Sequence, residues 1–219
     1  MKRALFKPLA LSCCAAVLVS ALSACVPLVI GGAAEGGSLV ATDRRTSGAQ
    51  LEDEGIELRG TSRLRSNLGE RGHINLTSYN RQVLLTGEIP TAQDKQLVEQ
   101  IISRVENVTS VVNELAVASN SSLAQRSSDT LITGRVKAQL IDAPDLFSNA
   151  FKVVTERSTT YLMGRVTQRE ADRATNVVRA TSGVQKVVRI FEVISENELA
   201  RLLPTPSKPQ PTGPKPDAN

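Results

Sequence analysis

Hydrophobic and polar positions follow one pattern twice in the middle of the chain. Residues 83–89 and 160–166 are both apolar runs with an internal glycine, and the two glycines lie 77 positions apart. Further on, the Val-rich segments 108–117 and 184–193 align with an offset of 76. A one-residue difference belongs in a turn, because inside a paired strand it would move every later side chain to the other face. We therefore predict two copies of one structural unit.

Each copy is predicted to contain a helix, a hairpin of two strands, a second helix and a final strand. In the second copy Ile132, Val136 and Leu140 recur at helical spacing, and Ser128 or Asp129 is the expected N-cap. The strands are rich in β-branched and aromatic residues and flank a polar turn. The first helices are predicted at 53–69 and 129–142, and the hairpin strands at 72–78, 82–88, 150–156 and 160–166.

The second helix of each copy begins with a capping-box sequence. Thr91 precedes Asp94 by three positions, and Thr167 precedes Glu170 in the same way. In such a box the Thr hydroxyl accepts from a backbone N–H, and the carboxylate accepts from the N–H of the cap. We expect the buried faces of these helices to be formed by Leu97, Val98, Ile101, Ile102 and Val105 in the first copy and by Ala174, Val177, Val178 and Thr181 in the second.

The pattern predicts an α+β fold with two tandem α-β-β-α-β domains, at residues 51–119 and 127–196. Each domain should be a small mixed three-stranded sheet with two helices packed on it, because a sheet must bury its apolar face against another layer.

The N-terminus has the three parts of a secretory signal. Three basic residues precede an apolar run from Leu9 to Leu22, which is too short to span a bilayer. The sequence Leu22-Ser23-Ala24-Cys25 that follows resembles the lipobox of bacterial lipoprotein precursors. We therefore predict a signal peptide at 1–24 and a covalent lipid on Cys25. Cys13 and Cys14 leave with the signal, so no internal disulfide is expected.

Two segments outside the repeats have the composition of linkers. Residues 25–50 are rich in Gly and are predicted to be a flexible tether with a reach of roughly 25–30 Å. Residues 203–219 contain a proline at almost every other position, which favours extended polyproline II. This tail is interpreted as a solvated spacer, with a partner-binding segment as the alternative.

Charge and composition argue against nucleic-acid binding. Removal of residues 1–24 takes away three basic residues and no acidic one, which lowers the formal charge from +4 by three to +1. The chain has no Trp, two Tyr and four Phe, so platforms for base stacking are scarce. We therefore expect no nucleic-acid partner.

The sequence offers few groups for catalysis or metal binding. His73 is the only histidine, and no Gly-x-Ser-x-Gly motif is present, so a catalytic triad is not expected. His73 is interpreted as a surface or strand-edge residue, and the Asp and Glu residues are placed at solvent-facing helix positions. The resulting expectation is no catalytic residue, no metal site, no cofactor beyond the lipid on Cys25, and no small-molecule substrate.

The repeat resembles the BON domain of bacterial envelope proteins. The resemblance is carried by residues 83–87 and 108–115 of the first copy, and by residues 127–130 and 164–170 of the second. Lipobox, tether and two BON copies in this order are similar to the dual-BON lipoproteins of the outer membrane. Val26 after the cysteine, where inner-membrane lipoproteins often have Asp, favours the outer membrane with the protein facing the periplasm.

The resemblance implies a non-enzymatic protein that supports outer-membrane integrity and binds anionic phospholipid through the first helix of its second copy. Close family members have an aromatic residue where this chain has Leu131, so the implied contact lacks an interfacial anchor. Lys137, Lys186 and Arg189 would add to it if they share its face. The positions that match the implied lipid site are Thr130, Leu131, Gly134, Arg135 and Ala138.

An alternative from the residues alone is a protein-binding adaptor. It would use the sheet faces or the Pro-rich tail to hold a partner in envelope assembly or division. The position of the two copies relative to each other decides whether the Leu131 edge is free to bind lipid or is buried between them.

Overall fold

The computed structural model describes residues 43–202, so the signal peptide, Cys25 and the Pro-rich tail lie outside the described residues. The first copy consists of α3 (Ser47–Leu68), β1 (His73–Tyr79), β2 (Gln82–Ile89), α4 (Ala92–Ser103), β3 (Ser110–Asn113) and β4 (Ala116–Val117). β1 and β2 form an antiparallel hairpin, and β3 and β4 both pair with β2 in parallel. The final strand is divided because Leu115 turns into the core, where its N–H donates to Asn113 Oδ1.

The second copy repeats this order with one continuous final strand. It consists of α5 (Leu123–Ile141), a short 3-10 turn at Ser148–Ala150, β5 (Lys152–Glu156), β6 (Thr159–Thr167), α6 (Gln168–Arg179) and β7 (Lys186–Ile194), followed by α7 (Glu196–Leu202). β5 pairs antiparallel and β7 parallel with β6. The four predicted hairpin strands agree with the structure within two residues.

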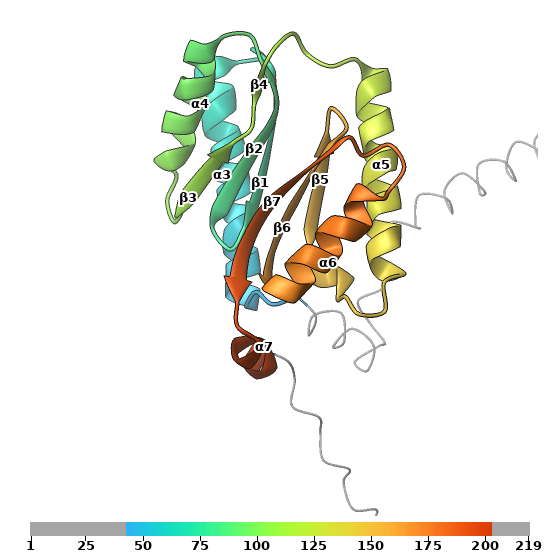
Figure 1. Cartoon of the computed structure of the whole chain (residues 1–219). Coiled ribbons are helices and arrows are strands. Elements are labelled where there is room, and N and C mark those ends of the chain that lie inside the picture. Colours follow the sequence, from blue (N-terminus) through green and yellow to red (C-terminus); the bar gives the residue numbers. More distant parts are fainter. Residues whose placement is uncertain (1–42, 203–219) are drawn as a thin grey trace, which may run out of the picture. The chain divides into compact units, whose positions relative to one another are not determined.

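Two helices cover one face of each sheet, as Figure 1 shows. α3 and α4 bury Ile56, Leu64, Val98 and Ile102 against Val83, Leu85 and Ile89 of β2. α5 and α6 bury Ile132, Val136, Leu140 and Val178 against Leu162 and Val166 of β6. The predicted α+β architecture is confirmed, with the final strand of the first copy divided into β3 and β4. Leu97, predicted to be buried on α4, is 37% exposed.

The first helix of each copy begins six residues before its predicted start, and in the second copy Asp129, one of the two expected N-caps, is buried inside the helix. The caps are Thr46 and Ser122, whose hydroxyls accept backbone N–H groups. Asp129 instead accepts from the backbone N–H of Arg157 and of Ser158, at 2.9 Å each. Asp53 accepts in the same way from the first copy's turn.

These two aspartates explain how the hairpin turns hold a strained backbone without glycine. All four central turn residues have positive φ, from 50 to 67°, as in the tight turns that match strand twist. A left-handed conformation costs roughly 1–2 kcal/mol at a non-glycine residue. The carboxylate offsets part of this cost, because it binds both turn N–H groups with charge-assisted hydrogen bonds. The aspartate therefore ties the first helix to the hairpin in each copy.

The two predicted capping boxes differ in the structure. In α6 the Thr167 hydroxyl and the Glu170 carboxylate satisfy each other's backbone N–H groups, so the complete box is confirmed. In α4 the Thr91 hydroxyl accepts from the Asp94 N–H, but the shorter Asp94 side chain bonds to the Thr91 hydroxyl and not to its backbone.

The faces of the two sheets that the helices leave open pack against each other. Tyr79 and Leu84 of the first copy form a buried cluster with Tyr161, Met163 and Ile190 of the second. β2 and β6 are consequently buried on both faces, which explains their continuous apolar runs. The sheet faces that an adaptor would use are therefore occupied within the chain.

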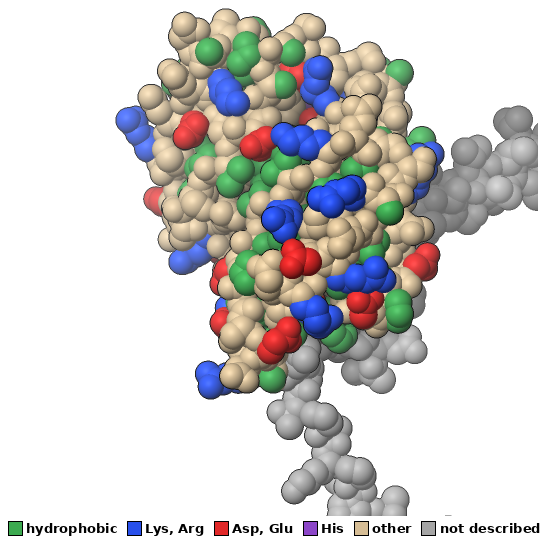
Figure 2. All heavy atoms as spheres, in the orientation of Figure 1, with side chains coloured by type: hydrophobic (Ala, Val, Ile, Leu, Met, Phe, Trp, Pro, Cys, Tyr) green, Lys and Arg blue, Asp and Glu red, His purple; other side chains and the backbone are tan. Residues whose placement is uncertain are grey.

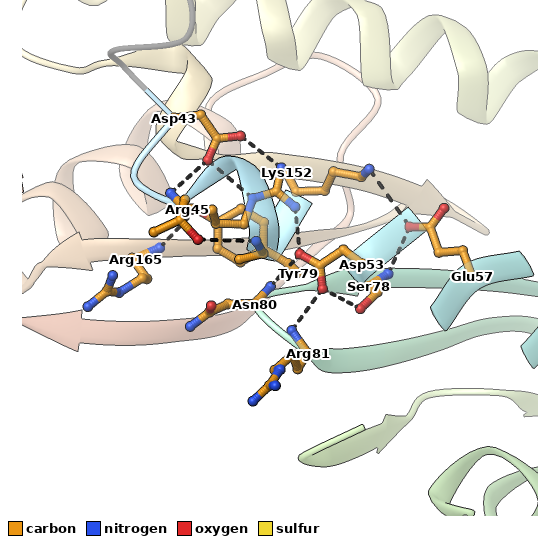
Figure 3. Close-up of polar contacts among 12 residues, drawn as sticks. Asp43, Arg45, Asp53, Glu57, Ser78, Tyr79, Asn80, Arg81, Lys152 and Arg165 are labelled. Atoms are coloured by element: carbon orange, nitrogen blue, oxygen red, sulfur yellow. Dashed lines mark hydrogen bonds and ion pairs between the residues drawn. The ribbon is translucent and has the colours of Figure 1, made fainter. Parts of the chain in front are cut away.

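Polar contacts lie at the edge of this junction between the two sheets, as Figure 3 shows. Arg45 contacts Asp43 and Asp53 at 2.8 Å each, and its guanidinium lies 4.3 Å from the centroid of the Tyr79 ring. The Tyr79 hydroxyl accepts from the Arg165 N–H at 3.4 Å. Burial raises the pKa of Tyr79, and the hydrogen bond from Arg165 only partly opposes it.

Part of the segment assigned to the tether is folded. Arg44 is buried and forms two 2.7 Å bonds with the Glu170 carboxylate at the start of α6. It also donates to the Arg165 carbonyl oxygen at 2.9 Å. The composition of residues 25–50 does not reveal this, because the partner of Arg44 is 126 positions away.

Candidate functional site

The implied lipid-binding residues all lie on α5, and the structure fixes which way this helix faces. Ile132, Val136 and Leu140 pack into the core of the second copy, and Asp129 holds the β5–β6 turn. Four contacts along one side leave the opposite side of the helix to solvent. Thr130, Leu131, Gly134, Arg135 and Ala138 are all exposed.

At 3.6 residues per turn, the exposed side of α5 is a continuous band of apolar and small residues. Leu131 is 62% exposed, and sequence reasoning missed Leu123 and Ile141, which are 78% and 67% exposed. Leu123 escaped notice because it lies before the predicted helix start. We call the following set the α5 stripe: Leu123, Thr130, Leu131, Gly134, Ala138 and Ile141.

Cations flank the α5 stripe, and no exposed carboxylate lies within α5 itself; the exposed Asp142 is the C-cap residue that directly follows Ile141. Arg135 and Lys137 lie at its two edges by helical spacing, and within residues 43–202 neither forms an ion pair. Asp129, the only acidic residue of α5, is buried on the opposite side. An apolar band with basic edges is the arrangement of helices that lie in a membrane interface.

The corresponding helix of the first copy lacks this combination. α3 also exposes leucines, Leu51 at 71% and Leu58 at 73%. Its sequence, however, places Glu52, Glu54 and Glu57 among them. Exposed leucine alone therefore does not distinguish the two helices, whereas the acids do: they lie among the leucines of α3, but the exposed acid of α5 is confined to its C-cap, Asp142.

The other predicted cations belong to a different part of the second copy. Lys186 and Arg189 lie on β7, and the Arg189 guanidinium contacts Asp172 of α6 at 3.1 Å. Figure 2 shows Lys and Arg side chains interspersed with Asp and Glu over this face. The basic character of the site is thus limited to the edges of the α5 stripe.

Several acidic residues are buried, which corrects the expectation that they face solvent. Asp53, Glu88, Asp129, Glu156 and Glu170 are each less than 10% exposed. Burial raises the pKa of Glu156, and the nearby carboxylates of Glu88 and Asp129 add to this effect. Sequence alone could have suggested a second buried face from the continuous apolar runs in β2 and β6.

These features define a protein of the tandem BON class. Residues 53–119 and 128–195 each match the model of the BON domain, and the chain belongs to this family. It is 35% identical over 175 residues to the outer membrane lipoprotein DolP of Haemophilus influenzae, a match that covers 79% of this chain and 90% of that protein. The order of two BON domains resembles DolP.

Two further relatives share this region. The 21 kDa hemolysin of Actinobacillus pleuropneumoniae is 31% identical over 69% of this chain and 79% of its own length. The osmotically inducible protein Y of Escherichia coli is 30% identical over 52% of this chain and 58% of its own length. Among residues 43–202, no helix is both long and apolar enough to cross a membrane.

Proposed function

We propose that the protein is a non-enzymatic outer-membrane lipoprotein, anchored through a lipid on Cys25 and facing the periplasm. It docks on anionic phospholipid through the α5 stripe and thereby supports outer-membrane integrity. The observation that carries this proposal is the exposed apolar stripe with basic edges, along which α5 has no exposed acid before its C-cap Asp142. The likeness to an outer membrane lipoprotein supports the location.

The energies of the individual interactions predict a weak contact between α5 and the membrane that depends on the lipid anchor. Full burial of a leucine side chain contributes about 1.5–3 kcal/mol, so the 62% exposed Leu131 can contribute about 1–2 kcal/mol. Arg135 and Lys137 each add about 1 kcal/mol near an anionic surface. A lipid on Cys25 makes this docking intramolecular, so a weak contact suffices to orient the second domain.

The test uses protein without residues 1–25, so that binding reports the folded domains and not the lipid. It is titrated against vesicles of phosphatidylglycerol and of phosphatidylcholine at low salt. We expect binding to the anionic vesicles only, weakened at least about tenfold by Leu131→Glu, because the substitution removes apolar insertion and adds a repelled charge.

The matched control is Leu58→Glu on α3, which changes a leucine of similar exposure in the other copy. It should leave vesicle binding unchanged. Equal loss from both variants, or no binding by the unchanged protein, refutes docking through α5. Crosslinks in cells that map to sheet edges or to residues 203–219, and not to α5, would favour the adaptor function.

A further inference from the structure

Three potential metal ligands meet where the hairpin of the first copy contacts the second copy. His73 is the first residue of β1, and it lies opposite Glu88 of β2 in the antiparallel register. Glu156 is the last residue of β5 in the second copy. Neither copy contains the complete set, so the cluster exists only when the two domains pack together.

The spacing of the three side chains suits one small cation. His73 Nδ1 lies 3.4 Å from Glu88 Oε2 and 3.8 Å from Glu156 Oε1. One ligand atom from each residue lies within 4.8 Å of the others. Tetrahedral ligands at zinc distances of about 2.0–2.1 Å are roughly 3.4 Å apart. Small side-chain rotations would therefore bring all three atoms into coordination.

Two ligand atoms of this cluster are buried and lack hydrogen-bond partners, which points independently to a bound ligand. Glu88 is 0% exposed, and its Oε1 atom accepts no hydrogen bond. His73 Nδ1 is likewise buried without a hydrogen-bond partner. The only charged partner of Glu88 Oε1 among the described residues is the Arg157 guanidinium, an ion pair at 3.7 Å that is too long for a hydrogen bond and whose Arg side chain is half exposed. Buried polar atoms are rarely left unsatisfied, so these two require an explanation.

Neighbouring groups already orient the two carboxylates. Glu88 Oε2 accepts from the Ser121 N–H at 3.0 Å. Glu156 Oε2 accepts from the Asn75 side-chain amide at 2.7 Å, which leaves Oε1 toward His73. Such outer hydrogen bonds are typical of metal-ligating carboxylates, because they fix the ligand direction before the ion binds.

We propose that His73, Glu88 and Glu156 form a binding site for a divalent transition-metal cation of the Zn²⁺ class. The imidazole favours a transition metal over Mg²⁺ or Ca²⁺. The two carboxylates carry the charge that balances one divalent ion. Three protein ligands leave a position for water or a partner's ligand. The ion joins the two BON domains and stabilises their packing.

The experiment uses the mature lipidated chain in detergent, purified without a histidine tag and stripped with a chelator. Zn²⁺ is titrated against a chromophoric competitor, with Mg²⁺ as the comparison ion. We expect one equivalent of Zn²⁺ per chain and no Mg²⁺ binding. At about 100-fold excess over the dissociation constant, Zn²⁺ should raise the Tm by roughly 5–10 °C.

A measurement on the unchanged protein avoids any problem with folding of variants. His73 is the only histidine of the chain, so its imidazole resonances report directly on this site. One equivalent of Zn²⁺ should shift them, with the larger change at Nδ1. Unshifted His73 resonances in the presence of bound Zn²⁺ would place the ion elsewhere and overturn the proposal.

Substitutions then separate a metal site from a general contact between the domains. Glu156→Gln should weaken Zn²⁺ binding by about tenfold or more. The matched control is Glu192→Gln, because Glu192 also accepts from an asparagine of the first copy, Asn80, at 2.7 Å. The control should bind Zn²⁺ normally. Equal weakening by both variants, or no Zn²⁺ binding by the unchanged chain, refutes the site.

Discussion

Replacing Arg44 with Met removes one half of a buried ion pair that joins the start of the folded region to the second domain. The side chains of Arg44 and Glu170 are 2% and 1% exposed. Their two parallel bonds of 2.7 Å have the bidentate geometry in which Arg–carboxylate pairs are strongest. Loss of Arg44 leaves a buried carboxylate at the N-terminus of α6 with a single donor.

The expected cost follows from that remaining donor. Removing one partner of a buried pair destabilises a protein by about 3–5 kcal/mol. Glu170 still accepts a hydrogen bond from the Thr167 N–H at 3.0 Å. The loss of unfolding free energy in Arg44→Met should therefore lie near the lower end of this range, at about 3 kcal/mol. For a domain pair of this size the Tm should fall by roughly 6–12 °C.

Chemical denaturation followed by circular dichroism measures this loss, and a double-mutant cycle with Glu170→Gln isolates the pair. The cycle should give a coupling energy of about 2 kcal/mol or more. Arg189→Met is the control, because its pair with Asp172 is half exposed and contributes at most about 1 kcal/mol. If Arg44→Met destabilises the protein less than Arg189→Met does, and the cycle gives no coupling energy, the stabilising role of the buried pair is refuted.

The same pair predicts how stability depends on pH. Burial raises the pKa of Glu170, but the hydrogen bonds from Arg44 and the Thr167 backbone outweigh burial, so the pKa is lowered from 4.5. A carboxyl with a lowered folded-state pKa contributes stability that is complete above its unfolded value and is lost as pH falls through the folded one. Denaturation midpoints below pH 4.5 should therefore fall more steeply in the unchanged protein than in Arg44→Met.

Four further substitutions test the fold. Asp129→Ala should cost about 2–4 kcal/mol in denaturation experiments, because the two turn N–H groups lose a charged acceptor. Gly87→Ala should destabilise the protein by more than about 3 kcal/mol, since the φ of Gly87 is 108° and an added Cβ would lie 2.0 Å from the carbonyl oxygen of His73. An added Cβ at Gly134 meets no atom within 4 Å, so Gly134→Ala should stabilise α5 by about 0.5–1 kcal/mol. Leu84→Ala at the junction should cost about 2–5 kcal/mol and increase amide hydrogen exchange in both domains; increased exchange in the first domain alone would refute mutual stabilisation.

The sequence predicts those parts of the fold whose boundaries are marked by local chemistry. Each hairpin strand ends at a polar turn, and each second helix begins at a Thr that caps it in the structure. The first helices begin six residues early because their opening turns contribute no buried apolar residue. Hydrophobic periodicity therefore gives no helix signal between Leu123 and Asp129.

The buried acids could not be predicted, because their partners lie far away in sequence: Asp53 and Asp129 bind the hairpin turn of their own copy, and others are placed by packing between the domains. Periodicity can place Glu88 opposite His73 once the hairpin is paired, but Glu156 joins them only through the contact between the sheets. For the lipid site, sequence reasoning selected five positions that the structure exposes; Leu123 was missed because it lies before the predicted helix start, and Ile141 was missed although it lies within the predicted helix.

The position of Arg44 gives the proposed anchor a direct route to the second domain. Nineteen positions separate Arg44 from Cys25, so the connecting chain can span at most about 65 Å even when fully extended. Although the first domain follows next in sequence, the chain that comes from Cys25 is held by Glu170 of the second domain, which also presents the α5 stripe. A lipid on Cys25 would thus raise the effective concentration of this surface at the membrane. Loss of the Arg44 pair should weaken α5 docking in the anchored protein more than in the protein without residues 1–25, because only the anchored protein uses that connection.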